Sequence, residues 1–285
     1  MKNKADKINI LGIDIDNLDI DTANNHIINL VQGTKDTYTT SQYVVKPYVE
    51  FMTKSHGDSH LRDILNKADL VLPDGISLQW ASSYIYGNPR KAFLKTIRSL
   101  LFWIHDKKWR TQVLKQNHGG PNQTIPLLKI AEQNKWNIGI LGGKQSEQKH
   151  RIQNLTKIFP GINKLYCWNG YYNQENNQKM VEEIRSKKLD VLFVAMGFPK
   201  QEEFIYQNRN NRLAKVLIGE GGTFDYDELG GSTKRAPKRI QRLGLEWAWR
   251  ITVQPKRILR LFSILRFIVL IKHFSRATKT KLFTL

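Results

Sequence analysis

The sequence predicts an α/β fold: a Rossmann-like, mostly parallel sheet with helices on both faces, followed by a basic helical C-terminal appendage. Two short apolar runs, residues 190–195 and 215–218, have the length and composition of buried parallel strands. Each run ends in a glycine-containing loop, MGFP at 196–199 and GEGG at 219–222. The order of strand, glycine loop and helix repeats along the chain, which is typical of a parallel sheet covered by helices.

The first ninety residues alternate between short strands and helices. An apolar first strand is expected at residues 8–13, and Asp21-Thr22 is expected to cap a helix that runs to about residue 31. A second strand, rich in Thr and Tyr, is expected at 38–40, and a buried strand at 70–72 ends at the turn signal Pro73-Asp74-Gly75. Helices are expected at 44–53, 59–67 and 76–86.

The second half continues the pattern after a segment that is harder to interpret. Residues 87–123 contain the apolar, basic run FLKTIRSLLFW at 93–103. This segment fits either an amphipathic helix with a surface loop, or an insertion that contacts a membrane or gates a substrate. Beyond it, strands are expected at 136–141 and 165–168, and helices at 124–135, from 146 onward, and at 175–187.

The charge of the chain is large and uneven. The 285 residues carry a net charge of +20, and from Gly230 onward there are 14 Lys and Arg against one acid, Glu246. Such a tail predicts an anionic partner: nucleic acid, an anionic membrane surface or a phosphate-rich substrate. The single cysteine, Cys167, allows no intrachain disulfide and agrees with a reducing, cytoplasmic setting. The N-terminal residues show no apolar stretch typical of a signal peptide.

The tail itself is predicted to be helical. Helices are expected at 239–253 and from Pro255 to about residue 274, and the longest apolar run, residues 267–271, is far shorter than the ~20 residues that span a bilayer. Arg260, Arg266 and Lys272 interrupt it, which predicts a helix lying in the membrane interface. The alternative is a helix packed on the domain through Leu259, Phe262 and Leu265. We therefore divide the chain into a Rossmann-like domain, 1–237, and a basic helical appendage, 238–285, that is expected to associate with a membrane.

Candidate site residues follow the strands, because ligands of open α/β sheets bind beyond the strands' carboxyl ends. Asp74 follows a buried strand and is either a general base or a cap of the next helix. Lys200, at a helix start, either meets a phosphate or stays solvated. Glycines in such loops let backbone N–H groups approach an anion. The candidates of this kind are Gly142, Gly143, Gly197, Gly221 and Gly222.

Three arginines of the tail are candidates for binding phosphate. Arg250 and Arg257 are seven residues apart, and Arg257 and Arg260 are three apart, so they fall near one helical face. A guanidinium group can bind phosphate with two parallel hydrogen bonds. The alternative role for each is contact with solvent or lipid.

Six short motifs, in this order and spacing, give the chain its resemblance to a known family. They are ADLVLPDG at 68–75, GFPKQE at 197–202, GG-x-FD at 221–225, RAP at 235–237, LEW-x-x-R at 245–250 and QP-x-R at 254–257. Together they resemble the WecG/TagA/CpsF glycosyltransferases over roughly residues 8–88 and 136–260. Two departures are visible: Thr40-Ser41-Gln42 stands where the family usually has Thr-x-Asn, and Glu220 stands where small or apolar residues are more usual.

The resemblance implies an inverting glycosyltransferase that needs no metal and no cofactor. It would move N-acetylmannosamine or a related hexose from a UDP-sugar to a polyprenyl-diphosphate-linked acceptor sugar, in surface polysaccharide or teichoic-acid-type biosynthesis. By the same resemblance Asp74 is the base, Thr40 and Gln201 position the sugars, and Gln42 binds substrate in place of the family's asparagine. The three tail arginines would close over the diphosphate, so that the appendage helps the catalytic domain to complete the active site. The protein would then work in the cytoplasm, peripherally on the inner face of the cell membrane, and whether it forms a homo-oligomer stays open.

Two other classes of protein could also account for parts of the sequence. A nucleic-acid-binding α/β protein could use the basic tail, with Trp247, Trp249 and Phe262 stacking on bases, but these aromatics fall in apolar helical patterns. A dinucleotide-dependent oxidoreductase is disfavoured because Gly12 stands alone where G-x-G-x-x-G would follow the first strand. His56 and His60 are four residues apart but begin in a loop, so no metal site is predicted.

Overall fold

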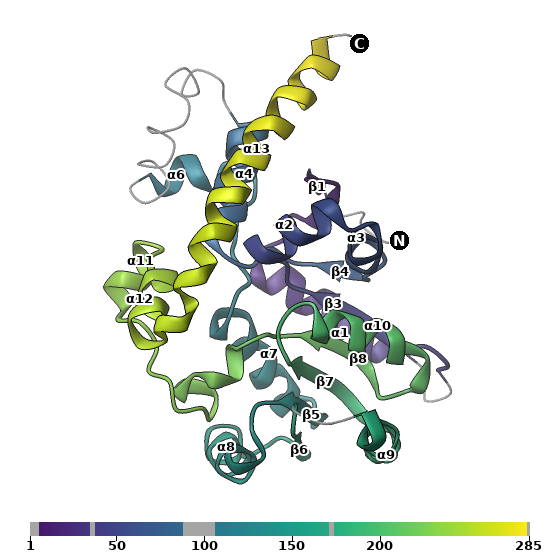
Figure 1. The fold of residues 1–285 in the computed structure, drawn as a ribbon. Coiled ribbons are helices and arrows are strands. Elements are labelled where there is room, and N and C mark those ends of the chain that lie inside the picture. The colour runs from purple at the N-terminus through teal and green to yellow at the C-terminus, as the bar shows by residue number, and fades with distance from the viewer. Residues whose placement is uncertain (1–5, 35–37, 88–105, 171–173, 284–285) are drawn as a thin grey trace.

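The protein, a computed structural model described here for residues 6–34, 38–87, 106–170 and 174–283, is built around a six-stranded sheet (Figure 1). The segment 93–103 lies outside the described residues. All neighbouring strands of this sheet are parallel, in the order β4-β3-β8-β7-β5-β6, which confirms the predicted fold class. The strands are β3 (Gln42–Val45), β4 (Leu70–Val71), β5 (Asn137–Gly142), β6 (Lys164–Trp168), β7 (Leu189–Ala195) and β8 (Ala214–Gly219).

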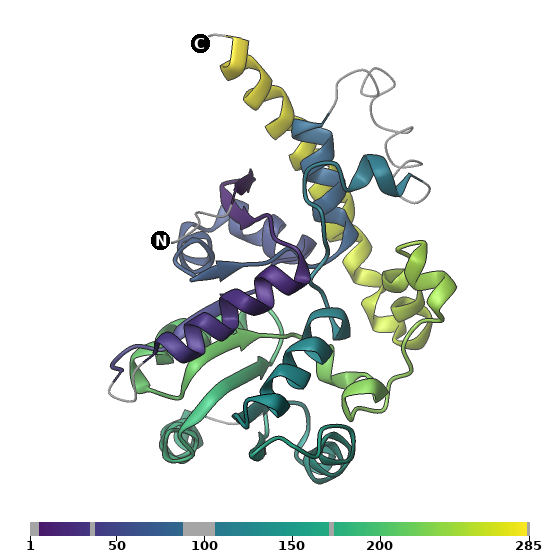
Figure 2. The ribbon, with the colours of Figure 1, turned by 180° about the vertical axis from the view of Figure 1, so that it is seen from behind.

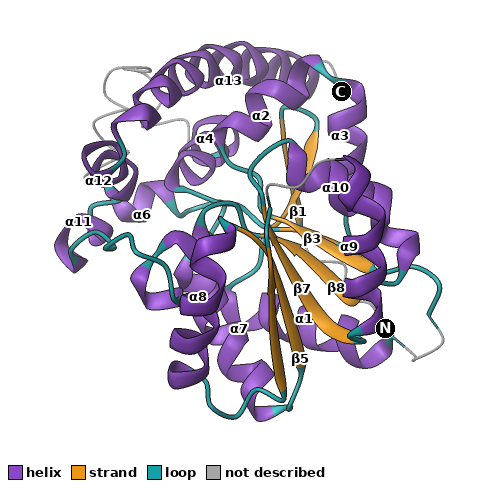
Figure 3. Cartoon of the chain, turned by 60° about the horizontal axis from the view of Figure 1, so that its bottom comes forward, coloured by secondary structure: helices purple, strands orange, loops and turns teal. Residues whose placement is uncertain are grey.

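Helices cover both faces of the sheet (Figures 2 and 3). Successive strand residues point to opposite faces, so Val194 and Leu217 join one buried hydrophobic cluster while Phe193 and Ile218 join the other. The first cluster is covered by α2 (Val49–Gly57), α3 (Ser59–Asn66), α4 (Ile76–Tyr86), α9 (Gln174–Ser186) and α10 (Lys200–Asn208). The second is covered by α1 (Ile20–Gly33), α7 (Pro121–Gln133) and α8 (Gln145–Ile158). A short helix, α6 (Lys107–Arg110), contacts α4.

The N-terminal strand expected at 8–13 is in fact a hairpin. β1 (Lys7–Ile10) pairs antiparallel with β2 (Ile13–Asp16) and forms a separate two-stranded sheet. The chain reverses at Leu11 and Gly12, which have φ of 53° and 85°. Gly12 adopts this left-handed conformation at little cost, so the glycine that interrupts the apolar run marks the turn.

The second strand of the sequence prediction was placed too early in the chain. The strand that enters the sheet is β3, not residues 38–40, and Val44 pairs with both Leu70 of β4 and Ile218 of β8. The helix expected at 44–53 begins only at Val49. Pro47 explains the difference, because a residue that precedes proline is disfavoured in helical conformation and favoured in extended conformation.

The C-terminal part folds back across the sheet's helical layer. It consists of α11 (Lys238–Arg242), α12 (Glu246–Val253), the 3₁₀ turn η5 (Pro255–Leu259) and α13 (Arg260–Phe283). α13 packs against α2 and α4, and its Phe267 and Ile271 are fully buried. Phe267 lies beside Trp80 of α4, with ring centroids 6.4 Å apart. This helix therefore belongs to the hydrophobic core as well as to the appendage.

Candidate active site

A pocket of about 440 Å³ opens at the carboxyl ends of the parallel strands. Its floor is formed by residues that lie one to three positions beyond the strands, including Lys46 after β3, Asp74 after β4 and Gly197 after β7. One wall of the pocket is formed by α12, η5 and the start of α13, which place Arg250, Arg257 and Arg260 beside the pocket. The pocket thus lies where the fold class predicts a ligand site.

Asp74 is a half-buried residue that lines this pocket. The N-cap of α4 is Gly75, and no side chain caps that helix, so Asp74 is not the helix cap that the sequence left open. Its backbone N–H donates to the Pro47 carbonyl at 2.9 Å. Gly119 lies so close that a Cβ there would come within 1.7 Å of Asp74 Oδ1, so the neighbouring loop needs glycine at this position.

The surroundings of Asp74 make it a stronger base than an ordinary aspartate. Burial raises the pKa of Asp74 to about 6, against the attraction of Lys46 and Arg250 and with the repulsion of Glu220 and Glu246. A carboxylate with a pKa just below neutral is mostly ionised at pH 7, and it accepts a proton more readily than one with a pKa of 4. This is the property expected of a general base.

Gln201 joins the two glycine loops that the sequence singled out. Its Oε1 accepts hydrogen bonds from the backbone N–H groups of Gly197, at 3.1 Å, and of Gly221, at 2.9 Å. Its Nε2 donates to Glu202 Oε1 at 2.7 Å. Gln201 therefore fixes the loops after β7 and β8 relative to each other, and two of the N–H groups expected to face an anion are used in this way.

The three tail arginines converge on the pocket. Arg250 donates to the Gly222 carbonyl at 2.8 Å and lies over the Tyr226 ring, 4.5 Å from its centroid. Arg257 lies 4.0 Å from the Asp225 carboxylate, and burial, with Arg250 and Arg260 nearby, lowers the pKa of Arg257 to about 10. Arg260 donates to Glu50 Oε1 at 3.1 Å. The carboxylates of Asp225 and Glu50 offset part of the charge of the three guanidinium groups, and a diphosphate in the pocket would offset the rest.

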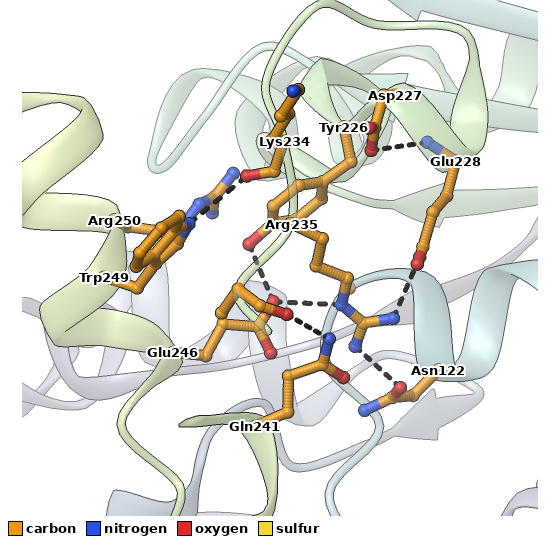
Figure 4. Close-up of polar contacts among 12 residues, drawn as sticks. Asn122, Tyr226, Asp227, Glu228, Lys234, Arg235, Gln241, Glu246, Trp249 and Arg250 are labelled. Carbon is orange, nitrogen blue, oxygen red and sulfur yellow. Dashed lines mark hydrogen bonds and ion pairs between the residues drawn. The ribbon is translucent and has the colours of Figure 1, made fainter. Parts of the chain in front are cut away.

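Arg235, from the RAP motif, holds the arginine-bearing helix in place (Figure 4). Its guanidinium group bonds Glu246 of α12 at 3.1 Å, Glu228 at 3.0 Å and Asn122 at 2.7 Å. The Tyr226 hydroxyl donates to the same Glu246 carboxylate at 2.9 Å. Nothing in the sequence alone indicates this role of the RAP motif. The structure shows that it links the loop after β8 and α7 to α12, which carries Arg250.

Four of the expected site residues do not line the pocket. Thr40 is exposed, precedes β3 and bonds Asn210, and the Gln42 amide faces the Asp69 carboxylate. Thr40 precedes β3 by two residues and Gln42 is its first residue, so both lie at the amino ends of the parallel strands. The pocket lies at the opposite, carboxyl ends. Lys200 donates to the Gly170 carbonyl at 2.9 Å, and the Gly142 carbonyl accepts from Arg151 at 3.1 Å. Of the glycines, Gly143, Gly197, Gly221 and Gly222 line the pocket.

One pair in the pocket was missed in part. Lys46 forms an ion pair with Glu220, and their side chains are 4% and 0% exposed. The sequence marks Glu220 as an unusual acid at its position, but it gives no signal for Lys46. The two residues are 174 positions apart, so nothing local in the sequence indicates that they meet.

The described residues contain neither a metal cluster nor a membrane-crossing helix. No three His, Cys, Asp or Glu side chains among them gather closely enough to hold a metal ion. Among the same residues, no helix combines the length and the hydrophobicity needed to cross a bilayer.

The appendage presents an apolar stripe to solvent. Ile258, Phe262, Leu265 and Val269 recur every three or four residues and are 54%, 72%, 62% and 53% exposed. The alternative in which Phe262 and Leu265 pack on the domain is therefore wrong for these two side chains. Large hydrophobic side chains in helical register are rarely left in water unless they meet a partner.

Comparison with known proteins points to one group of enzymes. The family described as "Glycosyl transferase WecG/TagA/CpsF family" matches residues 8–114 and 101–281. An N-acetylglucosaminyldiphosphoundecaprenol N-acetyl-beta-D-mannosaminyltransferase of Bacillus spizizenii is 26% identical over 262 residues, 91% of each chain. The protein of the same name from Staphylococcus aureus strain MRSA252 is 28% identical over 282 residues, 98% of this chain and 97% of the relative.

Proposed function

Because the chain belongs to the WecG/TagA/CpsF glycosyltransferase family, we propose that it transfers N-acetylmannosamine, or a related hexose, from a UDP-sugar to a polyprenyl-diphosphate-linked N-acetylglucosamine acceptor. The acceptor follows the names of the relatives, which act on N-acetylglucosaminyldiphosphoundecaprenol. The product would enter a surface polysaccharide or a teichoic-acid-type polymer. The nucleic-acid alternative is not favoured, because the basic tail also carries the arginines of the pocket.

The observation that carries the proposal is that one pocket contains both Asp74, a carboxylate with a raised pKa, and the guanidinium groups of three arginines. Asp74 would take the proton of the acceptor hydroxyl while that oxygen attacks the anomeric carbon of the donor. The bond from the anomeric carbon to the UDP oxygen breaks as the new bond forms, and a single displacement of this kind inverts the configuration. Arg250, Arg257 and Arg260 would stabilise the negative charge that develops on the departing UDP, without a metal ion.

The remaining pocket residues would act by holding this arrangement. Gln201 fixes the Gly197 and Gly221 loops that form the floor, as the hydrogen bonds above describe. Residues 238–285 would function as an appendage that completes the site, since Arg250, Arg257 and Arg260 all lie within it.

The test is a donor screen with the purified full chain. UDP release is followed for a panel of UDP-hexoses with a short-chain lipid-diphosphate-N-acetylglucosamine acceptor. We expect one N-acetylhexosamine donor to be strongly preferred, and Asp74→Asn to lower turnover by roughly 10²–10⁴-fold, the usual loss when general-base help is removed. Asp63→Asn, an exposed carboxylate on α3, is the matched control and should leave turnover unchanged. No transfer from any UDP-sugar, or full activity of Asp74→Asn, contradicts the proposal.

We further propose that the apolar stripe rests on the anionic inner face of the cell membrane, where a lipid-linked acceptor resides. Of the large hydrophobic side chains exposed among the described residues, seven of nine fall between Leu243 and Val269. Exposed cations, including Arg266 and Lys272, flank the stripe. Apolar side chains beside cations are the combination that binds helices to anionic bilayer surfaces.

Vesicle binding tests this placement. Phe262→Ser with Leu265→Ser removes two exposed side chains, so the fold is retained and partition onto vesicles of anionic phospholipid should fall at least tenfold, from about 25 cal/mol per Å² of apolar surface lost. Ile158→Ser, on α8 and 47% exposed, is the control. Transfer to a water-soluble short-chain acceptor should persist in all variants. Unchanged partition of the double variant would remove the stripe from the membrane contact.

A further inference from the structure

The floor of the pocket contains a buried ion pair beside the proposed base. Lys46 directly follows β3 and Glu220 directly follows β8, two strands that are neighbours in the sheet. The Lys46 ammonium bonds Glu220 Oε1, and both residues line the same pocket as Asp74. A buried ion pair contributes little stability compared with apolar side chains of similar volume. Its presence on the pocket floor therefore calls for another explanation than stability.

The backbone brings this pair next to Asp74. The Asp74 N–H donates to the carbonyl of Pro47, the residue after Lys46, so the two strand ends are tied together at 2.9 Å. Of the cations around Asp74, Lys46 has the largest electrostatic effect, and it lowers the pKa of Asp74. Nevertheless, no ion pair within 4.0 Å joins Lys46 to Asp74 in the described part of the chain, because the ammonium is held by Glu220.

A Lys46 ammonium that was free to pair with Asp74 would weaken Asp74 as a base. A lysine that pairs directly with a carboxylate stabilises the ionised form and makes the carboxylate a weaker proton acceptor. We propose that Glu220 is a positioning residue that binds the Lys46 ammonium and so prevents it from pairing with Asp74, which leaves the Asp74 carboxylate free to take the acceptor proton. This inference rests on the proposed function and assigns a role to the acid that is unusual at this position.

The pair also explains how an acid is tolerated beside a diphosphate. The charges of Lys46 and Glu220 cancel locally, so Glu220 adds no net negative charge to the pocket. The other charged groups that act on Asp74 are Arg250, which favours its ionised form, and Glu246, which opposes it. Arg235 and the Tyr226 hydroxyl both bond Glu246, so the position of that carboxylate is fixed.

The inference predicts pKa changes of opposite sign for the two partners. In Glu220→Gln the ammonium is released and a negative charge is lost, so the Asp74 pKa should fall by about one pH unit or more. In Lys46→Met a positive charge is lost, so the Asp74 pKa should rise. The double variant, Lys46→Met with Glu220→Gln, is uncharged at both positions and should return the pKa close to that of the parent. Charges that act only through space give additive shifts, so the double variant would then show the sum of the two single shifts. Release of the ammonium onto Asp74 instead predicts that the pKa in Glu220→Gln falls further than this additivity allows.

The experiment is a ¹³C NMR titration of the full chain labelled at aspartate side-chain carboxyl carbons. The Asp74 signal is identified by its absence in Asp74→Asn. The acid limb of the pH profile of kcat/KM, measured with the preferred UDP-sugar, should shift in the same directions as the NMR pKa. Asp190→Asn breaks the partly buried Lys215–Asp190 pair, 3.0 Å apart near the amino ends of β7 and β8, and should leave the Asp74 titration unchanged.

The two proposals can fail separately in this design. If the parent protein transfers no sugar, the proposed function is wrong, whereas the NMR titration still decides the role of Glu220. If Glu220→Gln leaves the Asp74 titration where it is, or shifts it upward, the inference is overturned even in an active enzyme. Lys46→Met leaves an unpaired carboxylate in the interior and is at risk of not folding. In that case Glu220→Gln and the double variant carry the test.

Discussion

Replacing Asp74 by asparagine should stabilise the protein while it removes the activity. The pKa of Asp74 is raised from 3.8 to about 6, so the folded protein resists ionisation of this group more than the unfolded chain does. Each pH unit corresponds to 1.36 kcal/mol, which sets an upper bound of about 3 kcal/mol on the cost at neutral pH. Because the side chain is half-buried, we expect about 1–3 kcal/mol.

The dependence on pH identifies this effect. Below pH 3.8 the carboxyl is protonated in both states and costs nothing; the cost grows as the pH rises through 6 and is constant above it. Asparagine does not ionise, so the difference in unfolding free energy between variant and parent should rise from pH 5 to pH 8 by roughly 1–1.5 kcal/mol. Urea unfolding at these two pH values measures it.

The control and the contrary result are both accessible. Asp63→Asn removes an exposed carboxylate and should show no such trend. A difference between Asp74→Asn and the parent that is flat from pH 5 to pH 8, or that falls with pH, would mean that the Asp74 carboxylate is not held in a desolvated pocket. The argument for Asp74 as a tuned base would then fail, whatever the loss of activity.

Three further predictions concern the arginines, the metal and α13. Arg257→Ala should lower kcat/KM about 10- to 100-fold through lost charge-assisted hydrogen bonds, whereas Arg266→Ala, which replaces an exposed arginine on α13, should not; equal activity of the two would remove Arg257 from the site. EDTA should leave turnover intact, and inhibition that Mg²⁺ reverses would refute the metal-free mechanism. Phe267→Ala should lower the unfolding free energy by about 3–5 kcal/mol in urea, since the ring is fully buried; a loss below 1 kcal/mol would mean that α13 is only loosely attached.

The burial of α13 bears on whether the chain could fold without its tail. From the sequence alone, the sheet is complete before Pro255, which suggests that the chain could fold without residues 255–285. The structure shows Phe267 and Ile271 in the same hydrophobic cluster as α2 and α4. Removal of the tail would therefore expose core residues, and point substitutions are the better probe of its function.

Much of the fold could be predicted because parallel strands buried on both faces appear as short apolar runs. β5, β7 and β8 were placed within about two residues for this reason. β3 was misplaced because Tyr38–Thr40 has strand-favouring residues but is largely exposed, while the true strand was assigned to a helix. The N-terminal hairpin was missed because its turn depends on Leu11 and Gly12 rather than on a recognised turn pair.

The site could be predicted where short motifs carry it, and not where distant residues meet. Asp74, Gln201, Arg250 and Arg257 belong to these motifs, and all four line the pocket. Thr40 was expected at the site from the family resemblance and from a strand that was placed too early, whereas in the structure it precedes β3 and does not line the pocket. The contacts of Arg235 with Glu246, and of Lys46 with Glu220, join residues that only the folded sheet brings together.

A single helix gives the enzyme three directions of contact. Arg260 and Ile264 of α13 line the pocket, Phe267 and Ile271 enter the core, and Phe262, Leu265 and Val269 face outward. At 1.5 Å per residue, Arg260 and Val269 are about 14 Å apart along the axis. If the outward side rests among lipid headgroups, a layer roughly 5–8 Å deep on each side of the bilayer, the mouth of the pocket sits close above it. The distance between the catalytic centre and the membrane surface would then be set by the single helix α13. The acceptor's diphosphate could reach the base while its polyprenyl chain stays in the bilayer.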